Sequence, residues 1–208
     1  MPQPIHYSEL ISFDFSPEAV LQRPKLAPHI AAISASWNEI EALIATLLAA
    51  LLGGEAKTVI SIFFAIRNDG AKKAATDAIC SLKLSPDDHK TLQAILKTVG
   101  ERYTDRNSAI HGAWGVSPQY PDKLLWADIP GTIKLHVEMM GLPGSTNREA
   151  RIAVQIAHQK TMQIWSEKDF TDTEERLRAT HKVLQDFCKP IIDGAFGPSG
   201  GRLPVRPH

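Results

Sequence analysis

An unbroken apolar seam between Leu26 and Leu52 constrains the fold of this chain more than any other feature. Large apolar side chains recur there in alternating steps of four and three residues, at Leu26, Ile30, Ile33, Trp37, Ile40, Ile44, Leu47 and Leu51. This spacing keeps them on one face of an α-helix. Neighbouring alanines widen the face, and Gly53-Gly54 ends it. The seam predicts a long helix over 26–52 that lies in a bundle core or, alternatively, at a dimer interface.

A second helix is predicted over 55–82. Gly70 should kink or break this helix. The apolar side chains that should face the core are Val59, Phe63, Ile66, Ala74 and Ala78. Arg67, Lys72 and Lys73 cluster around that break. Such a cluster fits a solvated surface or, as the sharper alternative, contact with a phosphate backbone.

Two more helices have clear start signals. Ser85-Pro86-Asp87-Asp88 combines a cap, a first-turn proline and acids at the positive helix end, which predicts a helix over 86–113. The capping-box pattern Thr171 to Glu174 predicts a final helix over 171–189 that ends around Pro190. The helices at 26–52, 55–82, 86–113 and 171–189 should form the bundle, so the fold class is all-α, or mainly α.

The stretch between the last two helices changes character. Ile133, Leu135, Val137 and Met139 alternate with polar residues, which is typical of a half-buried strand. Residues 124–126 precede Pro130-Gly131 and could pair with that strand. We therefore expect a small β-hairpin insertion at 120–140. The segment 150–165 fits either a strand or a helix.

Composition sets the remaining limits. The 208 residues, 43% hydrophobic and 22% charged, suit a single globular domain over 1–193, followed by a flexible tail at 194–208 rich in Gly, Pro and Ser. Because the net charge is zero, strong non-specific nucleic-acid binding is not favoured, and any basic patch must be small. The two cysteines lie in apolar contexts, and no signal-peptide pattern is present. The apolar run at 42–52 is too short to span a bilayer. These features predict a cytoplasmic location without membrane association.

One residue breaks the apolar pattern of the third helix. The packing positions there are Leu92, Leu96, Val99, Tyr103, Ile110 and Ala113, and Arg106 stands where another apolar residue is expected. A cation on a packing seam is costly unless an anion or a hydrogen-bonding group meets it. Asn107 and His111 follow, four residues apart, so their side chains can meet on one helix face.

Other sites of chemistry are not evident in the sequence. No two of the eight histidines have the spacing of a helical metal site, and no Cys-x-x-Cys, phosphate-binding glycine loop or Gly-x-Ser-x-Gly is present, so we expect no metal and no cofactor. By elimination His111 is the best candidate for chemistry. Alternatively, Asn107 and His111 merely cap the helix end, but that leaves Arg106 unexplained.

The run Arg106-Asn107-x-x-x-His111, followed by Gly112 near a helix end, resembles the signature of the HEPN superfamily of helical domains. Many members are metal-independent ribonucleases of toxin and phage-defence systems. The resemblance covers about Leu92 to Trp114. It lacks the toxin subgroup's tyrosine two positions after the histidine, where this chain has Ala113, and it does not account for the β insertion.

The resemblance implies a metal-independent endoribonuclease that cleaves RNA by attack of the 2′-OH. Arg106, Asn107 and His111 would be catalytic, with Arg67 and Arg102 as substrate-binding residues. The reaction needs two proton transfers, but each chain supplies only one motif histidine, and such enzymes generally dimerise, so we expect a homodimer. An antitoxin or other regulatory protein is a possible further partner. The alternatives are a catalytically silent HEPN-like module that binds nucleotides or a protein, and an unrelated bundle with a coincidental motif.

Overall fold

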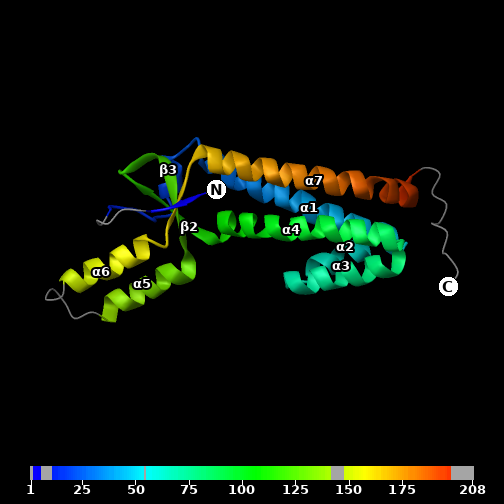
Figure 1. Cartoon of the computed structure of the whole chain (residues 1–208), viewed down its shortest axis with the longest axis horizontal. Coiled ribbons are helices and arrows are strands. Elements are labelled where there is room, and N and C mark those ends of the chain that lie inside the picture. The colour runs from blue at the N-terminus through cyan, green and yellow to red at the C-terminus, as the bar shows by residue number, and fades with distance from the viewer. Residues whose placement is uncertain (1, 6–10, 54, 142–147, 198–208) are drawn as a thin grey trace. The chain divides into compact units, whose positions relative to one another are not determined.

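The computed structural model describes residues 2–5, 11–53, 55–141 and 148–197, and helices predominate among them (Figure 1). The helices are η1 (Ala19–Gln22, a 3-10 turn), α1 (Ala27–Leu52), α2 (Ala56–Ala65), α3 (Asp69–Lys83), α4 (Pro86–His111), α5 (Ile129–Gly141), α6 (Arg148–Gln159) and α7 (Glu167–Phe196). The strands are β1 (Gln3–Pro4), β2 (Gly112–Ser117), β3 (Tyr120–Asp128) and β4 (Gln163–Trp165). The prediction of a mainly α fold is confirmed.

The chain divides into two compact units. The sheet unit comprises residues 1–34 and 104–175, and the helical unit comprises residues 35–103 and 176–208. Helices α1, α4 and α7 each contribute residues to both units. A single domain over 1–193 stays a prediction. Of the expected tail, residues 194–196 belong to α7, whereas 198–208 lie outside the described residues.

The core of the helical unit is built on the seam of α1. The predicted helix over 26–52 is confirmed with a start one residue later, and its seam side chains from Trp37 to Leu51 are buried. Helix α4 adds Leu92 and Val99, while α7 adds Leu177 and Leu184. Such burial of apolar area is the main stabilising contribution to a bundle.

Both cysteines are free and fully buried in this unit, as expected for reduced core residues. Burial raises the pKa of the Cys80 thiol to about 11 and that of Cys188 to about 12. Thiols with such pKa values remain protonated at neutral pH and are poor nucleophiles.

Helix α1 is also the one helix in the described ranges that is long and apolar enough to cross a membrane. Half of its most apolar 18-residue window (50%) is buried inside the structure. The core helix of a water-exposed bundle passes the same test of length and composition, so this finding is weak evidence for a membrane span.

The second predicted helix, 55–82, is in fact two helices. The chain breaks at Ile66–Asn68, not at Gly70, because the Asn68 side chain caps α3 by accepting a hydrogen bond of 2.9 Å from the Ala71 N–H. The break shifts the phase of the following turns. Ala74 and Ala78 are therefore exposed and not core-facing, whereas Thr76 and Cys80 of the same helix are buried.

The sheet unit contains an antiparallel sheet with strand order β1-β4-β3-β2. Strands β2 and β3 form a hairpin that begins directly after α4, with Gly112 opposite Asp128 and Trp114 opposite Trp126. Strand β4 pairs with β3 on the other side, and β1 pairs with β4. The sheet packs a core of Ile5, Ile11, Leu125, Ala127 and Met162.

The predicted hairpin is therefore present after the motif helix, but its second strand was wrong. Residues 124–126 lie in β3 and pair with β2 and β4, whereas 133–139 lie within helix α5. Helix-start signals prevail over the alternating pattern there. The Asp128 carboxylate accepts a 2.9 Å hydrogen bond from the Gly131 N–H, and Pro130 occupies the first turn. The ambiguous segment 150–165 supplies both α6 and β4.

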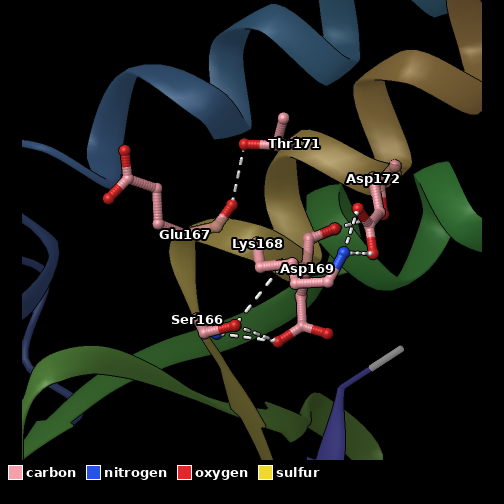
Figure 2. Close-up of polar contacts among 7 residues, drawn as sticks. Ser166, Glu167, Lys168, Asp169, Thr171 and Asp172 are labelled. Atoms are coloured by element: carbon pink, nitrogen blue, oxygen red, sulfur yellow. Dashed lines mark hydrogen bonds and ion pairs between the residues drawn. The ribbon is translucent and has the colours of Figure 1, made fainter.

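The final helix starts earlier and ends later than predicted. Figure 2 shows its cap: the Ser166 N–H and hydroxyl donate to Asp169 Oδ2 at 2.9 and 2.6 Å, and the Asp169 N–H donates back to Ser166 Oγ at 3.4 Å. This reciprocal pair is a capping box, so α7 begins at Glu167 rather than at Thr171. Pro190 lies inside the helix, which continues to Phe196.

Candidate functional site

The candidate motif occupies the last turns of α4, in the part of that helix that belongs to the sheet unit. The predicted start of α4 is confirmed, since the helix begins at Pro86. The Ser85 hydroxyl caps it by accepting a 3.2 Å hydrogen bond from the Asp88 N–H. The helix ends at His111, and the next residue, Gly112, already belongs to β2. The motif therefore lies at a helix-to-strand junction.

Arg106 holds the other two motif residues through one nitrogen. Its Nη1 donates to Asn107 Oδ1 at 2.8 Å and lies 3.0 Å from His111 Nε2. The two hydrogens of Nη1 are thereby both used. We had expected Asn107 and His111 to meet directly across one turn; the structure instead places the guanidinium between them.

This contact defines the role of one imidazole nitrogen. Arginine only donates, so a hydrogen bond at this distance directs the lone pair of His111 Nε2 at a cation. The side chain is otherwise exposed to solvent, which leaves the ring accessible to a ligand.

The rest of the Arg106 side chain is half-buried, and its Nε is fully buried. Within the described part of the chain, this Nε has no hydrogen-bond acceptor. A buried donor without an acceptor costs about 1–3 kcal/mol. Helix packing alone does not explain why an arginine occupies this seam position.

Two tryptophans that the sequence analysis did not single out fix the junction. The Trp114 indole N–H donates a 2.9 Å hydrogen bond to the carbonyl of Ala109, one of the acceptors that the helix end leaves without a backbone partner. Trp126 packs over Gly112 so closely that a Cβ at that position would overlap its indole ring. The Gly directly after His111 was the available signal for this close approach, but its partner follows only from the β2–β3 register.

The two predicted substrate-binding arginines belong to the helical unit. Arg102 donates to Glu101 at 3.3 Å, and Arg67 is exposed in the connection between α2 and α3. Lys72, which lies close to Arg67 in the sequence, forms an ion pair with Glu41, with 2.7 Å between Nζ and Oε1. The expected basic cluster around the helix break is therefore smaller than the sequence indicates.

Two other histidines pair with carboxylates. His29 Nδ1 lies 2.5 Å from Glu174 Oε1 in the sheet unit, and His89 Nε2 lies 2.9 Å from Asp77 Oδ1 in the helical unit. Neither pair is evident from the sequence, because the partners are 145 and 12 residues apart along the chain. No group of three potential metal ligands occurs among the residues that the structure describes.

No protein-family model matches this chain, and no curated protein or solved structure is similar to it.

Proposed function

We propose that this protein is a metal-independent endoribonuclease of HEPN type that cleaves RNA by transesterification through the ribose 2′-OH. The observation that carries the proposal is the 3.0 Å approach of the Arg106 guanidinium to the His111 imidazole at an exposed helix end. A phosphate bound by that guanidinium would lie next to the base that the reaction needs.

The proposed chemistry assigns one task to each motif residue. His111 Nε2 takes the proton of the 2′-OH as its oxygen attacks phosphorus, and Arg106 stabilises the added phosphoryl charge. Asn107 orients the guanidinium through its Oδ1. The 5′-oxygen leaves with a proton, which gives a 2′,3′-cyclic phosphate and a 5′-hydroxyl. No cofactor takes part.

A homodimer belongs to this proposal. Each chain supplies one motif imidazole, and the reaction needs both a base and an acid, so a second copy of the motif would supply the acid. A mixed dimer of Arg106→Ala and His111→Ala chains keeps only one motif imidazole, so it should stay as inactive as both parent dimers. A cytoplasmic toxin or phage-defence role, with an antitoxin or other regulatory partner, is part of the same proposal.

A second candidate function is a catalytically silent HEPN-like dimer that binds nucleotides or a protein partner. One observation favours it: the His111 Nε2 lone pair is already engaged by Arg106, so the base is blocked until that contact opens. In this case Arg106 and His111 together would be a binding surface.

RNA cleavage in the presence of EDTA distinguishes the two candidates. The nuclease should cut RNA at an unchanged rate with the chelator, lose activity with His111→Ala, and fail on a substrate with deoxyribose at the cleavage position. Cleavage of DNA, or a requirement for a divalent ion, would contradict the proposed chemistry. Binding of RNA without cleavage would support the silent module.

A further inference from the structure

The helical unit contains a pocket of about 230 Å³ that the motif does not use. Side chains of α1, α2, α3 and α4 line it, and every lining residue belongs to this unit. Its apolar wall consists of Trp37, Ile44, Phe63, Leu96, Val99 and Tyr103. A pocket of this size holds a compact molecule and is too small for most drug-sized ligands.

The charged groups on the pocket wall are largely satisfied within the protein. Lys72 Nζ donates to Glu41 Oε1 at 2.7 Å and lies 5.1 Å from the centre of the Phe63 ring. The Tyr103 hydroxyl donates to the Asp69 carboxylate. The remaining charged group, Lys73, is exposed to solvent. The interior therefore offers no unpaired charge to an anionic or cationic ligand.

Gly100 lies where α4 borders the pocket. It lies within α4, where glycine costs about 0.5–1 kcal/mol relative to alanine. A Cβ built at Gly100 would have no heavy atom within 4 Å, so no packing contact requires a glycine there. Gly100 lines the pocket and is itself exposed to solvent.

We propose that this pocket binds a compact uncharged aromatic molecule. The apolar wall favours a ligand without charge, because burying an unpaired charge there would be costly. The rings of Trp37 and Tyr103, which both line the pocket, lie 5.5 Å apart at an angle of 55° and so pack against each other in a tilted arrangement. Aromatic ligands pack favourably against such rings in offset and edge-to-face arrangements. The proposal rests on residues outside the motif and is independent of the nuclease hypothesis.

Three probes with one ring system test the proposal: indole, which is neutral, indole-3-acetate, an anion, and tryptamine, a cation. Each is titrated into the ¹⁵N-labelled full chain, and the amide signals of Gly70 and Gly100 report binding because both residues line the pocket. Indole should shift these signals saturably, and the charged analogues should bind about tenfold more weakly or worse. No saturable shift with indole, or tighter binding of a charged analogue, would overturn the proposal.

A matched pair of variants locates the site. Gly100→Leu adds a bulky side chain at a residue that lines the pocket and should weaken indole binding about tenfold or more. Ala94→Leu adds the same side chain to an exposed position of α4 outside the pocket, and indole binding should stay as in the wild type. Gly100→Ala, which favours the helix, should give a smaller loss and keeps the test valid if the leucine variant does not fold. Equal indole affinity in wild type, Gly100→Leu and Gly100→Ala would contradict the assignment.

Discussion

The two units differ in how they satisfy their buried polar groups. Among the described residues, the buried side-chain nitrogens without a hydrogen-bond acceptor are Arg106 Nε, Trp126 Nε1, Arg151 Nε and Trp165 Nε1, and all belong to the sheet unit. In the helical unit, the partly buried Lys72 meets Glu41, and His89 meets Asp77. Most buried polar groups in proteins have partners, so exceptions call for a cause.

Packing rules account for the helical unit more fully than for the sheet unit. The helical unit follows from apolar seams and paired charges, as expected of a bundle selected for stability. The sheet unit retains donors that its own described residues do not satisfy, and one of them belongs to the motif arginine. Unsatisfied donors of this kind occur at sites that bind ligands, because a ligand oxygen can complete them.

The largest expected effect is on cleavage and concerns the sheet unit. His111→Ala removes the proposed base and should lower the rate of RNA cleavage about 100-fold to 10,000-fold, the usual range for a lost general base. Arg106→Lys should also be severely impaired, because an ammonium cannot reproduce the planar guanidinium's hold on Asn107 and phosphate. Asn107→Ala should be milder. Single-turnover rates on a labelled RNA measure all three.

His181→Ala is the matched control in the helical unit, since it removes an imidazole from α7 outside the motif. Its cleavage rate should equal that of the wild type. If the two alanine variants lose activity equally, the loss reflects folding or contamination and the comparison between the units fails.

The next effect is on stability and contrasts two glycines. Gly112→Ala places a methyl group into the Trp126 indole and should lower the free energy of unfolding by about 3 kcal/mol, at the upper end for overpacking. Gly100→Ala meets open space within a helix and should raise the same quantity by about 0.5–1 kcal/mol. Urea unfolding monitored by circular dichroism measures both. Equal effects of the two substitutions would contradict the close packing at Gly112.

The sequence predicted elements that depend on local signals. The α1 seam gave that helix to within one residue, and the Ser85 cap gave the start of α4. The strand at 133–139 was wrong, because Ile129, Ile133 and Val137 also have helical spacing and Asp128 caps the helix. Period-two alternation over a short run cannot override a strong helix start.

The candidate site was predicted in composition but not in geometry. The motif spacing indicated a direct Asn107–His111 contact, yet the long Arg106 side chain reaches both neighbours. Helix periodicity describes where Cβ atoms lie, but not where the end of a long, flexible arginine side chain lies. Trp126 was missed because its approach to Gly112 depends on strand register, which sequence alone does not determine.

A smaller effect tests the junction itself. Trp114→Phe keeps an aromatic ring beside Trp165 and Phe170 but removes the donor to the Ala109 carbonyl. The cost should be about 2 kcal/mol of unfolding free energy, from an unsatisfied acceptor and lost volume. Because Ala109 lies between Asn107 and His111, amide hydrogen exchange should accelerate at 109–111 and stay unchanged at the buried turn around Leu92. Uniform acceleration along α4 would show global destabilisation instead.

The smallest effect concerns the cap of α7 and its dependence on pH. Burial opposes ionisation of Asp169, but hydrogen bonds from the Ser166 hydroxyl and N–H prevail and hold the pKa of its carboxyl below 3.8. A carboxylate with a lowered pKa in the folded state stabilises the protein above its unfolded pKa, and this contribution is lost as the pH falls through the folded value. Asp169→Asn should therefore cost about 1 kcal/mol at pH 7, the usual worth of a cap. In urea titrations from pH 7 downward, the difference between wild type and variant should shrink once the pH falls below 3.8. Gln185→Ala, at an exposed position of the same helix, removes no ionisable group and serves as the control that lacks this pH dependence. A wild-type-to-variant difference that stays constant through this acidic range would show that the charge of Asp169 does not contribute to the cap.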